Sequence, residues 1–124
     1  MSKHVYTTPG MEHLPFCSAI KAGDFIFLSG TAALKDDNGN NLTTIEGQTH
    51  QIMKQMARTL SNFDATLDDI VKVTIYIGEQ AEWFKMNDVY RSYFKGDLPA
   101  RATCVAGLVV PGFLIEMEAV AYKP

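Results

Sequence analysis

The sequence predicts an α+β domain in which two helices cover one face of a mixed β-sheet. Two observations predict it. The hydrophobic patterns follow the order strand, strand, helix, strand, helix, strand, strand. The length of 124 residues suits one domain, so we expect residues 1–124 to share one core. A chain this short has no third layer for the other sheet face, so we expect copies to associate through that face.

Two strands are expected near the N-terminus, after a loop that proline and glycine punctuate at residues 8–15. Residues 16–21 and residues 25–29 are rich in apolar and aromatic side chains, which favour strands. The Gly23-Asp24 pair between them predicts a hairpin turn. Residues 35–41 follow as a polar surface loop.

A helix and a strand are expected in the middle of the chain. Thr43 can cap the helix, with Glu46 three residues later as its capping-box partner. Apolar residues recur at helical spacing from Ile45 to Phe63, where we expect the helix to end. Residues 71–77 then alternate between apolar and polar side chains, which predicts a strand with one buried face.

The C-terminal third predicts a second helix at about residues 80–94, which stops at Gly96 and has an aromatic apolar side. Strands follow at residues 100–108 and 113–122, and Pro111-Gly112 between them predicts a turn. We expect these two strands to pair as a hairpin. That pairing puts four polar or charged side chains on one sheet face, namely Arg101, Thr103, Glu116 and Glu118.

Composition argues against several classes of function. The net charge of −3 and the scattered Lys and Arg residues disfavour a nucleic-acid partner. No segment has the roughly 18 to 20 uninterrupted apolar residues that a membrane span needs. The first four residues lack the apolar stretch of a signal peptide, so we expect a cytoplasmic protein with no membrane partner.

The cysteine and histidine patterns predict no metal or cofactor. Cys17 and Cys104 are expected to be free, buried thiols. His4, His13 and His50 do not have the spacing of a metal site. No glycine-rich phosphate loop is present.

Arg101 is the residue whose role the pattern leaves most open. It can be a solvated surface residue, an ion-pair partner of Glu116 or Glu118, or a ligand anchor. A surface ion pair contributes typically under about 1 kcal/mol. As an anchor, the guanidinium group matches a carboxylate through two parallel hydrogen bonds, and a nearby glutamate can orient a water molecule or move a proton.

Four segments, taken in order and spacing, resemble the RidA/YjgF family of reactive intermediate deaminases. The similarity covers about residues 15–121. The segments are Phe25-Ile26-Phe27-Leu28-Ser29-Gly30-Thr31, Met86-Asn87-Asp88-Val89-Tyr90, Pro99-Ala100-Arg101 and Ile115-Glu116-Met117-Glu118-Ala119-Val120-Ala121.

The resemblance implies a chorismate-mutase-like fold and a homotrimer whose sheets form a central barrel, with ligand sites in the clefts between subunits. It implies hydrolysis of 2-imino or 2-enamino acids to 2-keto acids and ammonia, without a cofactor. Arg101 matches the family arginine that holds the substrate carboxylate, and Glu118 is matched to the glutamate that orients water. Asn87, Ser29 and Gly30 match positions that line or support the family site.

The chain departs from the family pattern at two places that bear on the substrate. Phe16 stands where the family usually has a tyrosine, so one hydroxyl that would contact the ligand is missing. Thr103 stands where some members have cysteine, although backbone groups there can still bind a carboxylate. Phe16 can instead provide an apolar wall for a larger substrate.

Four alternatives stay open at this point. The protein can bind 2-keto acids without turnover, or deaminate a larger ring-cleavage product of the 2-aminomuconate type. It can be a ribonuclease, which the acidic balance and the lack of a basic groove disfavour. It can also be a structural trimer in which Arg101 and Glu118 form an ion pair between subunits.

Overall fold

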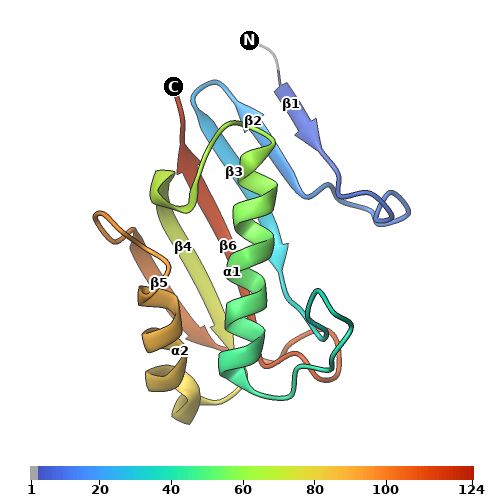
Figure 1. Ribbon diagram of the computed structural model, residues 1–124, viewed down its shortest axis with the longest axis vertical. Helices are drawn as coiled ribbons and strands as arrows, with labels where there is room; N and C mark the ends of the chain where they lie inside the picture. Colours follow the sequence, from blue (N-terminus) through green and yellow to red (C-terminus); the bar gives the residue numbers. More distant parts are fainter. Residues whose placement is uncertain (1–2) are drawn as a thin grey trace.

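The computed structural model describes residues 3–124. Its elements are β1 (Lys3–Tyr6), β2 (Ala19–Ala22), β3 (Phe25–Thr31), α1 (Ile45–Ser61), β4 (Ile70–Ile77), α2 (Trp83–Arg91), β5 (Ala100–Val105) and β6 (Ile115–Tyr122). The strands form one sheet in the order β1-β2-β3-β6-β4-β5, and α1 and α2 lie on one of its faces (Figure 1). The predicted α+β fold with a mixed sheet and two helices is confirmed.

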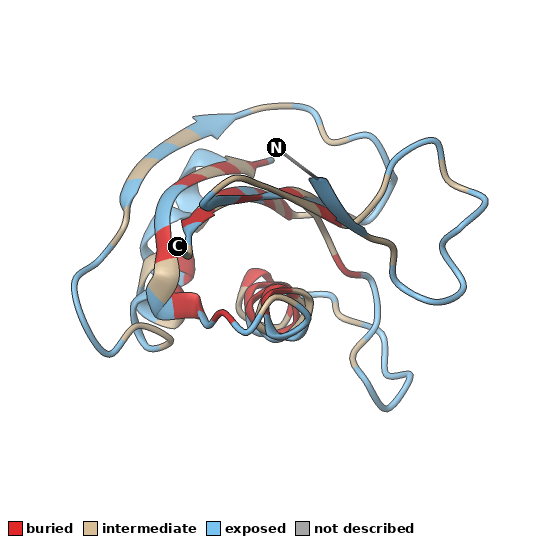
Figure 2. Cartoon of the chain, turned by 90° about the horizontal axis from the view of Figure 1, so that it is seen from above, coloured by how far each residue is buried: buried red, intermediate tan, exposed pale blue. Residues whose placement is uncertain are grey.

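The core lies between that sheet face and the helices. Val73, Ile75 and Ile77 alternate along β4 with polar residues and are buried. The apolar side of α1 packs against this face of the sheet, and its residues Ile52 and Met56 are also buried. Seen end-on in Figure 2, α1 is buried on the side that faces the sheet and exposed on the other. The two hydrophobic periods in the sequence therefore define a single buried layer.

The N-terminal strands differ from the prediction in extent. β2 begins only at Ala19, so residues 16–18 of the predicted strand lie in the preceding loop. β1 was not predicted, because its four residues are mostly exposed and show no alternation between buried and exposed positions. The β2–β3 hairpin is antiparallel as predicted, and Gly23 adopts a φ of 59° in its turn, a conformation that glycine accepts without strain.

Thr44 caps α1, so the prediction of Thr43 is wrong. The backbone of Thr44 is extended, and its hydroxyl accepts a hydrogen bond of 3.1 Å from the Gly47 N–H. Glu46 follows Thr43 by three residues, as a capping-box partner does, yet the chain turns into the helix one residue later. α1 also ends at Ser61, before the expected residue 63.

The predicted C-terminal hairpin is wrong. β5 pairs in parallel with β4, whereas β6 lies between β3 and β4 and is antiparallel to both. β4, α2 and β5 form a strand–helix–strand unit, in which a helical crossover lets two parallel strands pair. The two strands are also shorter than predicted, because β5 ends at Val105 and β6 starts at Ile115.

The observed strand pairing differs from the predicted one, so different residues share a face of the sheet. Arg101 is level with Val73 and Thr103 is level with Ile75, so both point to the helix side of the sheet. Glu116 and Glu118 alternate with the buried Ile115 and Met117 and point to the opposite side. The expectation that Arg101, Thr103 and the two glutamates share one face is therefore wrong.

Smaller differences concern β4 and α2. Val71 is 44% exposed, because the register between β4 and β6 shifts between Ile70 and Lys72. The predicted helix over residues 80–94 is shorter in the structure, with a 3₁₀ turn at Gln80–Glu82 before α2. On its aromatic side, Tyr90 is buried, whereas Trp83 is 40% exposed.

Gln48 connects α1 to the start of β6. Its side chain is fully buried, and its Nε2 donates to the carbonyl oxygens of Leu42 and Gly112 at 3.0 and 2.9 Å. Its Oε1 accepts from the Leu114 N–H at 2.9 Å. Three hydrogen bonds from one buried amide thus hold the segment that leads into Glu116.

We expect Thr44→Ala to lower the free energy of unfolding by about 1 kcal/mol, because an orphan N–H at the helix start loses its acceptor. Thr43→Ala is the matched control and should change it by less than about 0.5 kcal/mol. Urea denaturation monitored by circular dichroism measures both. Equal losses, or a larger loss for Thr43→Ala, would show that the cap is wrongly placed.

Candidate functional site

Arg101 lies half-buried near the start of β5, under α2. Its Nη2 donates a hydrogen bond of 2.7 Å to Asn87 Oδ1, and its Cζ lies over the ring of Tyr90 at 5.0 Å from the centroid. Among residues 3–124, no carboxylate lies within ion-pair distance of it. The charge is therefore not compensated within this part of the chain, and the remaining N–H groups are free to bind an anion.

Thr103 lies two residues beyond Arg101 on the same face of β5. Its hydroxyl is buried from solvent and has no hydrogen-bond partner among the residues described. Because the hydroxyl is buried, a ligand does not reach it in this arrangement. The predicted substrate-binding role of Thr103 stays a prediction that depends on its backbone or on a rotation of its side chain.

A second group of predicted residues lines a cleft of about 860 Å³ next to β3. The predicted residues in its wall are Phe16, Ser29 and Gly30, and Glu116 joins them. Ser29 Oγ donates to the Cys17 carbonyl oxygen at 2.7 Å, which ties β3 to the loop that carries Phe16. Phe16 is 56% exposed and lines this cleft, and its role as an apolar wall for a substrate stays a prediction.

Gly30 and Glu116 are in close contact across the β3–β6 pair. A side chain at position 30 would collide with the carboxylate of Glu116. The pairing of β3 with β6 is irregular between Leu28 and Thr31, and Gly30 lies within this irregular stretch. The absence of a side chain at Gly30 thus lets the Glu116 carboxylate lie against β3 and face the cleft.

Glu118 lies on the same sheet face but has a different environment. Its Oε1 accepts a hydrogen bond of 3.1 Å from the Tyr76 hydroxyl, and its side chain is exposed. This hydrogen bond to Glu118 raises the pKa of Tyr76 above its ordinary value. The family resemblance implies Glu118 as the residue that orients water, and this role stays a prediction. In the structure it is Glu116 that lines the cleft. No pattern in the sequence separates two glutamates that share a face.

One chain does not bring the two groups together. β6 and β4 separate β3 from β5, which puts Arg101 at least about 14 Å from Ser29 at three inter-strand spacings. Arg101 also points to the helix side of the sheet, while Glu116 points to the other side. Arg101 with Asn87 and the cleft at Glu116 are therefore two separate groups within one chain.

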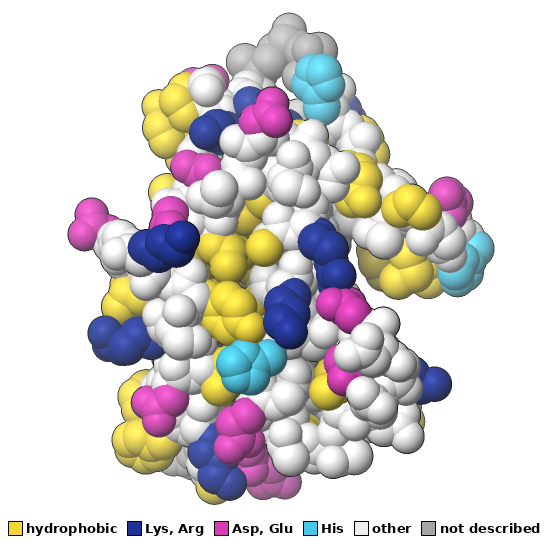
Figure 3. Space-filling view, viewed as in Figure 1, with side chains coloured by type: hydrophobic (Ala, Val, Ile, Leu, Met, Phe, Trp, Pro, Cys, Tyr) yellow, Lys and Arg dark blue, Asp and Glu magenta, His cyan; other side chains and the backbone are white. Residues whose placement is uncertain are grey.

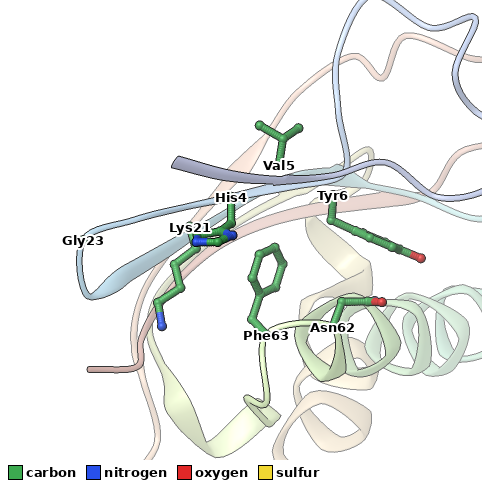
Figure 4. Close-up of a pocket in the computed structure, with 7 residues that line it drawn as sticks. All are labelled: His4, Val5, Tyr6, Lys21, Gly23, Asn62 and Phe63. Carbon is green, nitrogen blue, oxygen red and sulfur yellow. The ribbon is translucent and has the colours of Figure 1, made fainter. Parts of the chain in front are cut away.

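A further cavity of about 720 Å³ lies between the β1–β2 hairpin and the end of α1 (Figure 4). His4 and Lys21 project from the strands, and Phe63 lies between them and the helix. No residue predicted for the functional site lines it.

Within residues 3–124, no three His, Cys, Asp or Glu side chains are grouped so that they could hold a metal ion. No helix in the same range is long and apolar enough to cross a membrane. On the helix side of the molecule, basic and acidic side chains are scattered among polar ones (Figure 3).

The chain is similar in sequence to known proteins over most of its length. Residues 11–123 match the family model described as endoribonuclease L-PSP. A RutC family protein of Pyrococcus abyssi is 37% identical over 110 residues, which cover 88% of this chain and 87% of the relative. Reactive Intermediate Deaminase A, chloroplastic, of Arabidopsis thaliana is 33% identical over 108 residues, 86% of this chain and 58% of that protein.

Solved structures of the same kind have the same fold. A Rid family protein from Yersinia pestis has a TM-score of 0.86 and 33% identity, with 98% of this chain and 99% of that chain covered. A YjgF family protein from Neisseria meningitidis has a TM-score of 0.85 and 27% identity, with 100% and 97% covered. Both the sequence and the fold place this chain in the YjgF/RidA family.

Proposed function

We propose that this protein hydrolyses 2-imino and 2-enamino carboxylic acids to 2-keto acids and ammonia. The observation that carries the proposal is Arg101, a half-buried guanidinium group that has no carboxylate partner within residues 3–124 and is held by Asn87. A buried or half-buried cation without a counter-charge favours an anionic ligand. The name of the Arabidopsis relative, Reactive Intermediate Deaminase A, supports the reaction type.

The reaction needs little beyond positioning. Arg101 binds the substrate carboxylate through two N–H groups that Asn87 leaves free. Water adds to the carbon of the iminium group C=NH₂⁺, and one proton of that water moves to nitrogen. The C–N bond then breaks, the C=O bond forms, and NH₄⁺ leaves with the second proton. Holding the substrate next to an oriented water molecule accounts for much of the expected acceleration.

Glu116 is the carboxylate that we propose orients this water, in place of Glu118. Glu116 lines the cleft with Phe16 and Ser29, and its carboxylate lies against Gly30. Glu118 is engaged by the Tyr76 hydroxyl outside the cleft. A general base must lie within hydrogen-bond reach of the water that it activates, so the residue in the cleft is the better candidate.

The complete site is proposed to form between two copies of the chain. Within one chain Arg101 lies at least about 14 Å from Ser29. Its side chain points to the opposite side of the sheet from Glu116. We therefore call the two groups half-sites, because one copy does not supply both to one small substrate. The uncovered sheet face carries large apolar side chains, with Phe27 49% exposed, Tyr122 45% and Phe25 40%. Such a patch favours burial against another copy. A homotrimer around a central barrel, as the family resemblance implies, would form three such sites.

Two other functions are possible for this fold, and the tests described below distinguish them from the deaminase. A protein that binds 2-keto acids without turnover would keep the role of Arg101 and show no acceleration. The family model carries the description endoribonuclease L-PSP. RNA cleavage is disfavoured by the net charge of −3.

The first test is release of ammonia and 2-ketobutyrate from 2-iminobutyrate generated in situ. The wild-type protein should accelerate hydrolysis above the buffer rate. Arg101→Ala should lower kcat/KM by about 100-fold, because two charge-assisted hydrogen bonds to the carboxylate are lost. A wild-type rate equal to the buffer rate would contradict the deaminase assignment for small imines. Tight binding of 2-ketobutyrate without turnover would then support the binding protein.

A matched pair of substitutions tests the glutamate. Glu116→Gln keeps the size of the side chain and removes the base, so it should lower kcat by about 100-fold. Glu118→Gln should change kcat by less than about twofold, because Glu118 lies outside the cleft. Steady-state kinetics on 2-iminobutyrate measure both. The reverse order of effects would restore Glu118 as the catalytic carboxylate.

Mixing two inactive variants tests whether the site is shared. When Arg101→Ala and Glu116→Gln chains are co-expressed, about one quarter of the sites should combine an intact Arg101 with an intact Glu116 from another copy. Activity should recover to about that fraction of the wild-type value. Each variant alone is the control. No recovery in verified mixed assemblies would place both residues in one copy's site.

A further inference from the structure

Tyr90 is a buried aromatic residue that none of the functional assignments above uses. It is 4% exposed and lies on α2, one helical turn after Asn87. The guanidinium carbon of Arg101 lies over its ring at 5.0 Å from the centroid. Phe94 also packs against the ring, with 4.9 Å between the ring centroids. Tyr90 therefore belongs to the apolar core and also contacts the charge that the proposed site uses.

The hydroxyl of Tyr90 does not explain its position. It is buried and has no hydrogen-bond partner among residues 3–124. A buried hydroxyl without a partner costs free energy, so it does not stabilise this arrangement. Burial raises the pKa of Tyr90 to about 12, although the charge of Arg101 opposes the shift. The ring stays neutral at physiological pH, and its face can attract a cation.

Asn87 and Tyr90 restrain the guanidinium group in two different directions. They are three residues apart on α2, so their side chains lie on the same face of the helix. Asn87 accepts a hydrogen bond from Nη2, which acts in the plane of the guanidinium group. The Tyr90 ring contacts a face of the group, which leaves the other N–H groups free in that plane.

We propose that Tyr90 is a positioning residue for Arg101 and acts through the face of its ring, not through its hydroxyl. The consequence for binding rests on the proposed function, because it assumes that Arg101 binds the substrate carboxylate. The same contact holds the carboxylate in the ground state and in the transition state. Its loss therefore weakens binding and leaves kcat nearly unchanged.

Two substitutions separate the ring from the hydroxyl. Tyr90→Leu removes the aromatic face and should raise the KM for 2-iminobutyrate and the Kd for 2-ketobutyrate by about three- to tenfold. Its kcat should change by less than about twofold. Tyr90→Phe keeps the face, so it should retain the wild-type KM and Kd. It should also melt at or above the wild-type temperature, because an unpartnered buried hydroxyl is removed.

Tyr93→Leu is the matched control. It removes the same side chain from the same segment, but Tyr93 contacts His50 and not Arg101. It should leave KM and Kd unchanged even where it lowers the melting temperature. A similar rise in KM for Tyr93→Leu would mean that loss of packing alone weakens the site, and the proposal would be wrong.

An NMR measurement tests the contact without relying on activity. The Arg101 Nε–H resonance of the wild-type protein should carry a ring-current shift that Tyr90→Phe preserves and Tyr90→Leu removes. If this shift is absent or unchanged in Tyr90→Leu, or if Tyr90→Phe raises KM as much as Tyr90→Leu does, the proposal fails. If the wild-type protein neither binds nor turns over these acids, the proposed function fails, and the NMR result alone decides the role of Tyr90.

Discussion

The parallel pairing of β4 with β5 determines where Arg101 lies, and the rest of the site depends on it. In this register Arg101 is level with Val73, so its side chain emerges beneath α2 and not on the uncovered face. There it meets Asn87 and Tyr90 from the crossover helix. The strand–helix–strand unit thus supplies both the charge and the groups that orient it. A hairpin between β5 and β6 would instead have put Arg101 beside the glutamates as an ion-pair partner.

Arg101 and Glu116 point to opposite sides of one sheet. The proposed chemistry therefore needs a second copy of the chain to bring both residues to one substrate. The uncovered face carries Phe25 and Phe27, which favour burial against another copy. Association that buries these rings would also explain how two half-sites come to act on one small molecule. Stability and catalysis would then rest on the same interface, and a dissociated chain would lose both.

From the sequence, the positions of the helices and strands were predicted better than the pairing of the strands. Period-two alternation located β4, and the family motifs pointed to Arg101 and Asn87, which are in contact. Alternation shows which residues share a face of one strand but not which strand lies beside it, so the parallel β5 was missed. The contact between Gly30 and Glu116 depends on an irregular register in β3, which leaves no local signal. Tyr90 has the ordinary pattern of a core aromatic residue, and only the structure shows the charge above it.

The central claim is that the two half-sites of neighbouring copies enclose one 2-keto or 2-imino acid. A crystal structure of the protein with 2-ketobutyrate tests it most directly. The account predicts a carboxylate within about 3 Å of the Arg101 guanidinium of one copy. It also predicts Glu116 of a second copy near the ketone carbon. A structure in which a carboxylate side chain of the second copy occupies Arg101, with no ligand present, would contradict it and indicate a structural ion pair.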